Sequence, residues 1–211
     1  MHRNPLLELL ARYAVTFPGE DASVGRVRAL VEGHPDCFER TCMPGHVTAS
    51  AWILSPDRGR VLLTRHRKLE RWLQLGGHAD GDGDALRVAL REAREESGMT
   101  RFGVICPGGD AKAADPPLPL DIDVHAIPAR GHEPEHAHHD IRYLLVAGEE
   151  QSLAMSHEST DLGWFEPAAL ARLGADDSLL RLRRKAAPLL GSPVRWCPDP
   201  APADGPQESN P

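Results

Sequence analysis

Apolar residues recur every three or four positions in two segments near the start of the chain, the spacing of the buried face of an α-helix. Pro18 and Gly19 interrupt the pattern between the two segments. The two stripes consist of Leu6, Leu7, Leu10 and Tyr13, and of Val24, Val27, Leu30 and Val31. We therefore expect a helical extension over residues 1–45. Packing of its stripes on the main domain of the same chain is the favoured interpretation, and a homodimer formed through them is the alternative.

From residue 46 onward the apolar positions alternate with polar ones or form short runs, as in β-strands. The predicted strands cover residues 47–54, 60–66, 71–78, 121–127 and 141–148 and a segment that ends at Phe165. A closing helix is expected at 176–191. Strands, an inserted helix, more strands and a last helix describe an α+β domain.

The inserted helix follows a glycine turn, in the stretch GGHADGDGDALRVALREAREESGM at residues 76–99. Positions i, i+3 and i+4 share one helix face, so Glu92, Glu95 and Glu96 bring three carboxylates together. Another face carries the apolar residues Leu86, Leu90 and Ala93. A hard divalent cation such as Mg²⁺ binds through oxygen ligands and would relieve the repulsion between the carboxylates. The alternative is a solvated charged helix with Arg–Glu pairs.

This stretch resembles the Nudix box, G-x5-E-x7-R-E-U-x-E-E-x-G-U, in which U is aliphatic. The matching residues are Gly77, Arg91, Glu92, Ala93, Glu95, Glu96, Gly98 and Met99. One position departs, because Gly83 stands where the box has its upstream glutamate. The alternatives are that Asp82 or Asp84 replaces that glutamate, or that the residue serves only as a helix N-cap.

The resemblance implies a mixed β-sheet sandwiched between helices over residues 46–175. It also implies hydrolysis of a phosphoanhydride bond in a nucleoside diphosphate linked to another moiety, by attack of water on phosphorus. Mg²⁺ or Mn²⁺ would be held by the three glutamates, and a small nucleotide would be the substrate. The further site residues expected from it are Gly76 and Gly77, whose backbone would approach the metal, and Arg91, which would orient a glutamate. His78 directly follows these glycines, and the alternatives for it are that it faces the diphosphate or that it only satisfies local hydrogen bonds.

The general base is less defined by the sequence. Glu95 or Glu96 would serve while bound to the metal, and Glu158 in a polar loop before the last strand is the outside candidate. A Nudix-like domain that binds a nucleotide without cleaving it is the alternative function. Gly83 favours that alternative, and the intact glutamate trio opposes it.

A histidine-rich segment, expected to be a loop, follows the strand at 121–127. It contains His132, His136, His138 and His139. Solvated loop histidines are the favoured interpretation. If His125 and the group His136, His138 and His139 converge beside the glutamates, we expect a second metal site or a phosphate-binding wall.

The composition limits which partners the protein could bind and which cellular compartment we expect for it. A net charge of −7 over 211 residues argues against a general grip on nucleic acid. The four cysteines form no CxxC pair and favour free thiols, and no apolar run reaches membrane-spanning length, so a cytoplasmic protein is expected. Residues 192–211 are rich in proline and small polar residues and predict a disordered tail.

Overall fold

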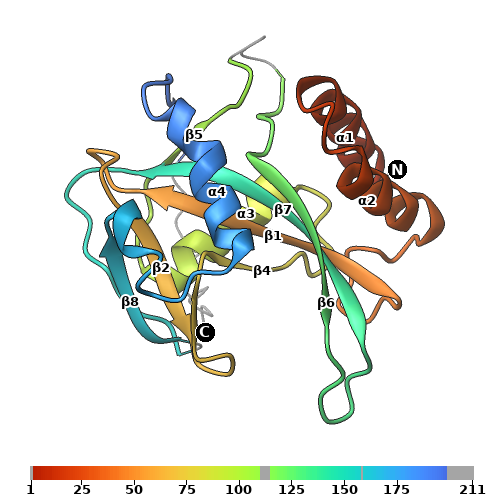
Figure 1. Ribbon diagram of the computed structural model, residues 1–211. Coiled ribbons are helices and arrows are strands. Elements are labelled where there is room, and N and C mark those ends of the chain that lie inside the picture. Colours follow the sequence, from red (N-terminus) through yellow and green to blue (C-terminus); the bar gives the residue numbers. More distant parts are fainter. Residues whose placement is uncertain (1, 110–114, 158, 199–211) are drawn as a thin grey trace, which may run out of the picture.

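The computed structural model describes residues 2–109, 115–157 and 159–198. A large mixed β-sheet runs through it, with helices on both faces (Figure 1). The strands are β1 (Gly45–Leu54), β2 (Val61–His66), β3 (Arg71–Leu73), β4 (Leu75–His78), β5 (Phe102–Ile105), β6 (Asp121–Ile127), β7 (His136–Ala147), β8 (Ser159–Phe165) and β9 (Arg195–Trp196). The helices are α1 (Asn4–Thr16), α2 (Asp21–Gly33), α3 (Ala85–Ser97) and α4 (Asp177–Ala186), with 3₁₀ turns η1 (Pro167–Ala169) and η2 (Ala187–Leu189). This architecture confirms the predicted α+β fold and its N-terminal helical extension.

Two long strands form the centre of the sheet. β1 and β7 run parallel, in register from Gly45 opposite Ala137 to Leu54 opposite Val146. On its other edge β1 pairs with β4 and then β2, and β7 likewise pairs with β6 and then β5, all antiparallel. β3 and β8 continue the sheet beyond β2, and β9 continues it beyond β5.

Different helices cover the two faces of the sheet. Alternate side chains of a strand point to opposite faces. Val47, Ala49 and Ala51 of β1 belong to the core that includes α3 and the N-terminal helices. Trp52 and Leu54 point the other way and pack with α4, which lies across the opposite side of the sheet (Figure 1). The remaining even-numbered residues of β1 are His46, Thr48 and Ser50, which point to the same face as α4. They are polar and lie outside the apolar core around α4.

The apolar stripes of α1 and α2 are buried within this chain. Leu10, Tyr13, Val27 and Val31 are each 0% exposed and belong to the same core as α3. α1 packs against α2, and α2 packs against β6. Packing on the chain's own domain is therefore confirmed, and the stripes are not available as the surface of a homodimer.

The histidine-rich segment is only partly the loop that the sequence predicts, because His132 lies in a turn whereas His136, His138 and His139 lie in β7. β7 already begins at His136, because that residue pairs with Ile127 of β6 and the next, Ala137, pairs with Gly45 of β1. His138 and His139 therefore lie inside a central strand. Polar side chains occupy one face of this part of β7, so the apolar alternation that normally marks a strand is missing from the sequence.

The predicted disordered tail also begins with ordered structure. Arg195 and Trp196 form β9, with Trp196 opposite Gly103 of β5. A Cβ atom at Gly103 would lie 3.1 Å from the indole ring, so the glycine allows this close approach. A two-residue edge strand gives almost no pattern in a sequence. Residues 199–211 lie outside the described part of the chain.

Candidate active site

The helix α3 is fixed at both ends by its own sequence. The Asp84 carboxylate accepts the backbone N–H groups of Leu86 and Arg87, each at 3.1 Å, which is the predicted N-cap. Gly98 ends the helix in the left-handed conformation with φ of 72°. The apolar residues buried along the helix are Ala85, Val88, Ala89, Leu90 and Ala93. This anchoring brings the glutamates of the helix to strand β4.

Two glycines of β4 lie very close to the carboxylates of Glu92 and Glu96. The backbone N–H of Gly76 donates to Glu96 Oε2 at 3.1 Å, and Glu96 is only 8% exposed. A Cβ atom at Gly77 would lie 2.6 Å from the Glu92 carboxyl carbon. The space that a side chain of residue 77 would fill therefore holds the Glu92 carboxylate.

Arg91 links the helix to the end of β4. One of its guanidinium nitrogens, Nη2, donates to the backbone carbonyl of His78 at 2.6 Å and to Glu92 Oε1 at 2.9 Å. The guanidinium therefore lies where it orients Glu92 and fixes the last residue of β4 at the same time.

The three carboxylates have different surroundings. Glu95 is exposed, whereas Glu92 is half-buried and Glu96 is buried. Their oxygens do not all lie within 4.8 Å of one another, although three imidazoles elsewhere in the described residues do. The donor set nevertheless fits a hard divalent cation, because carboxylate oxygens are its preferred ligands and the backbone beside Glu92 leaves room for them.

The departure at Gly83 has a structural counterpart. A Cβ atom at Gly83 would lie 2.6 Å from the backbone carbonyl oxygen of His2 and 3.5 Å from the Phe38 ring. The segment that precedes α1 thus occupies the space that a glutamate side chain would need. Asp82 does not take its place near the trio, because its carboxylate is paired with Arg87.

A buried carboxylate on the α4 face was missed by the sequence analysis. Asp140 of β7 accepts the hydroxyls of Ser50 at 2.7 Å and Thr48 at 3.2 Å, and it is 4% exposed. Burial raises the pKa of Asp140 above its ordinary value, although the charge of Arg142 opposes this effect. The two-residue alternation of polar positions from His136 to Arg142 is the sequence signal that marks this face.

Next to Asp140 a buried ion-pair network joins the sheet to α4. Arg142 is 0% exposed and donates through Nε to Asp121 Oδ2 at 2.7 Å. Arg181 and Lys185 of α4 reach Asp121 Oδ1 at 3.1 and 3.0 Å. Burial works against the ionised carboxylate, but the three cations outweigh it and lower the pKa of Asp121.

At the other end of the same face, histidines from four neighbouring strands gather. His138 of β7 lies at the centre, and its ring centroid is 4.9 Å from His46 of β1, 5.1 Å from His78 of β4 and 5.6 Å from His125 of β6. Burial, reinforced by repulsion between the rings, lowers the pKa of His46 to about 4 and that of His138 to about 2. Of the histidines named for convergence beside the glutamates, His125, His136 and His138 meet here, on the face of the sheet opposite to α3. His139 follows His138 directly in β7 and therefore points to the other face.

Several sequence predictions fall elsewhere. Glu158 lies outside the described residues, so its role as general base stays a prediction. The four cysteines are free thiols, as expected. Among the described residues, every helix is too short or too polar to cross a lipid bilayer.

Comparison with known proteins places the fold. A family model described as a NUDIX domain matches residues 44–186, a range that includes α4. A NUDIX-family hydrolase from Clostridium perfringens superposes with a TM-score of 0.51 at 21% identity, over 67% of this chain and 95% of that one. No curated protein matches the chain by sequence.

Two further solved structures are similar at lower scores. An Ap4A hydrolase binary complex from C. elegans gives a TM-score of 0.47 at 17% identity, over 68% of this chain and 96% of that one. The NUDIX domain of Shewanella oneidensis NrtR, complexed with ADP ribose, gives 0.44 at 16% identity, over 77% and 96%.

Proposed function

The chain belongs to the NUDIX family, and from that premise we propose that it is a metal-dependent hydrolase of a nucleoside diphosphate linked to another moiety. The observation that carries the proposal is the fit between α3 and β4. Glu96 is held by the backbone of Gly76, and Glu92 fills the space left open by Gly77. This arrangement supports a cation-binding role for the carboxylates of the box rather than a purely solvated charged helix.

In the proposed reaction Glu92, Glu95 and Glu96 hold a Mg²⁺ or Mn²⁺ ion. Bound there, such a cation neutralises charge on phosphate oxygens and lowers the pKa of a water molecule. Arg91 keeps Glu92 oriented through the 2.9 Å contact between them. Gly76 and Gly77 let the backbone of β4 approach the phosphates closely.

The proton of the attacking water needs an acceptor. The exposed Glu95 is free of the backbone contact that holds Glu96, and it is the better placed of the two to reach a water molecule. Glu158 remains the alternative base from outside the helix.

The decisive experiment measures, by chromatography, the nucleoside monophosphate and the phosphorylated moiety that hydrolysis forms from each member of a panel of nucleoside diphosphate derivatives, with Mg²⁺ or Mn²⁺. We expect Glu95→Gln and Glu96→Gln each to lower turnover by at least about a hundredfold, because each removes a carboxylate from the reacting centre. Glu149→Gln, which changes an exposed glutamate far along the chain, is the matched control and should retain full turnover. Unchanged turnover in both helix variants would refute the assigned roles.

A nucleotide-binding domain without catalysis is the second candidate. The observation in its favour is Gly83, where the His2 carbonyl excludes the glutamate of the box. Calorimetric binding of a nucleotide across the same panel, without product formation under either metal, would establish this function in place of hydrolysis.

A further inference from the structure

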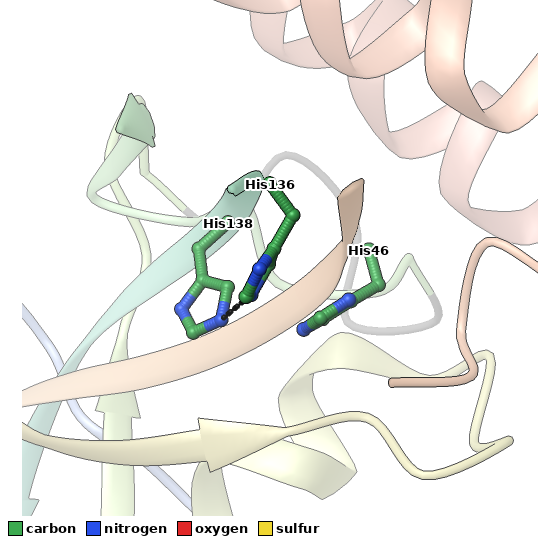
Figure 2. Close-up of side chains that lie close together, drawn as sticks. All are labelled: His46, His136 and His138. Atoms are coloured by element: carbon green, nitrogen blue, oxygen red, sulfur yellow. Dashed lines mark hydrogen bonds between the residues drawn. The ribbon is translucent and has the colours of Figure 1, made fainter. Parts of the chain in front are cut away.

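Three histidine side chains on the α4 face meet at one point. His46 of β1 is directly opposite His138 of β7 in the parallel register, and His136 precedes His138 by two positions on the same face. One ring nitrogen from each of the three lies within 4.8 Å of the others. Figure 2 shows the three rings side by side at the starts of the two central strands. The cluster is therefore built by strand pairing in the centre of the sheet and does not depend on a loop.

One of these rings lacks the polar partners that burial demands. His46 is 0% exposed, and neither of its ring nitrogens reaches hydrogen-bond geometry with any described residue, although the Cys42 backbone lies near enough to favour the protonated ring. Buried polar atoms are nearly always satisfied, and an unsatisfied one is destabilising. A ligand bound at the cluster would supply the missing partner.

The ring of a second histidine, His136, is oriented so that one nitrogen can offer its lone pair to a metal ion. His136 Nδ1 lies 2.9 Å from the Pro134 carbonyl oxygen, which can only accept, so Nδ1 carries the proton and Nε2 offers its lone pair. A carbonyl that fixes the tautomer in this way is the usual outer-shell partner of a metal-bound histidine.

The spacing of the rings also suits a metal ion. His136 Nε2 and His138 Nε2 are 3.4 Å apart, and two nitrogens bound to one tetrahedral Zn²⁺ at about 2.0–2.1 Å would be separated by about 3.3 Å. The Glu133 carboxylate lies 3.7 Å from His136 Nε2 and is exposed, so it is a candidate for the fourth ligand.

We infer that His46, His136 and His138 form a binding site for a borderline-soft divalent transition metal ion of the Zn²⁺ type. Neutral imidazoles select such ions, whereas carboxylate oxygens suit Mg²⁺ and Mn²⁺. The site uses none of the α3 glutamates, so it is independent of the proposed hydrolysis. His78 lies between the two sites, because its ring contacts that of His46 and its backbone carbonyl accepts a hydrogen bond from Arg91.

The test is a Zn²⁺ titration of the untagged, full-length protein after removal of metals with a chelator, with a competing chromophoric chelator as readout. We expect one Zn²⁺ per chain, and a loss of affinity of at least about tenfold in His46→Gln and in His138→Gln. His132→Gln, an exposed histidine outside the cluster, should bind as the original chain does. Glu95→Gln should also bind Zn²⁺ normally even if it abolishes turnover, which separates this test from that of the proposed function.

The Co²⁺ spectrum of the unmutated protein keeps the test decisive if the variants fail to fold. Co²⁺ at the histidines should give visible ligand-field bands without a thiolate charge-transfer band. The other described group with suitable spacing, His34, Asp36 and Cys42, would show that thiolate band and would lose metal in Cys42→Ser. That result, or the lack of stoichiometric Zn²⁺ binding at micromolar concentrations, would overturn the inference.

Discussion

At the scale of single residues, three glycines shape the candidate active site because they have no side chain. Gly76 faces Ser50 so closely that a Cβ atom would lie 2.6 Å from the Ser50 Cα atom, and Gly77 leaves its space to Glu92. Gly83 in turn leaves room for the His2 carbonyl. None of these three glycines has a positive φ, so each is required by close approach and not by backbone conformation.

We predict that Gly77→Ala weakens Mn²⁺ binding and lowers turnover, each by about tenfold or more, because the new methyl group must displace the Glu92 carboxylate. Electron paramagnetic resonance of free Mn²⁺ measures the affinity directly. Gly25→Ala is the control, since a Cβ atom there meets nothing within 4 Å. Equal Mn²⁺ affinity in the two variants would show that the Glu92 position is unimportant for the metal.

Individual residues also show which parts of the site can be predicted from the sequence and which cannot. Helical periodicity is a local property, so the sequence could predict that Glu92 and Glu96 share a face of one helix, and the structure places both beside β4. Asp140 and His46 could not be assigned in the same way. The alternation of polar positions marks the face of β7 that carries Asp140, but the environment of both residues is created by the pairing of β1 with β7, and no local pattern specifies which distant strands pair.

At the scale of elements, α4 is joined to the sheet by apolar contacts and by charge. Leu179 and Leu182 pack into the core with Trp52, while Arg181 and Lys185 bind Asp121. The amphipathic pattern predicted the helix, but the partner of its basic residues became visible only when β6 was placed beside β7. Buried ion pairs of this kind make stability sensitive to pH.

We predict that the free energy of unfolding falls steeply below about pH 4 through this network. The folded-state pKa of Asp121 is lowered from 3.8, so its stabilising contribution is complete above that value and is lost as the pH falls through the lowered folded-state pKa. Urea unfolding at a series of pH values between 5 and 2.5 measures the slope. Asp121→Asn should flatten that slope, and Glu149→Gln should leave it unchanged; identical slopes in all three proteins would contradict the role of Asp121.

At the scale of the whole molecule, the N-terminal helices are part of the domain's core. Lys185 of α4 donates to the Tyr13 hydroxyl at 2.7 Å and to Glu20 at 2.5 Å, so the first and last helices are joined directly. His2 meanwhile contacts the start of α3 at Gly83. The sequence predicted these helices and their buried stripes. It could not show what they cover, because amphipathicity gives the direction of an apolar face and not its partner.

We predict that Leu10→Ala lowers the free energy of unfolding of the entire domain by about 2–5 kcal/mol, the range for a leucine truncated in a core. Leu10 is 0% exposed, whereas Val15 on the same helix is 83% exposed. Val15→Ala should therefore stay within about 0.5 kcal/mol of the original protein. If Leu10→Ala unfolds α1 alone and leaves the urea transition of the sheet unchanged, the helices form a separate unit.

The parallel pairing of β1 with β7 has a consequence for folding during protein synthesis. Thr48 and Asp140, which bond across these strands, are 92 residues apart. During translation β1 therefore cannot pair with β7 until most of the chain has been synthesised. Contacts that close such long loops slow folding, so the histidine cluster should form only after β7 has been translated and has paired with β1, and a metal ion should bind it only from that stage onward.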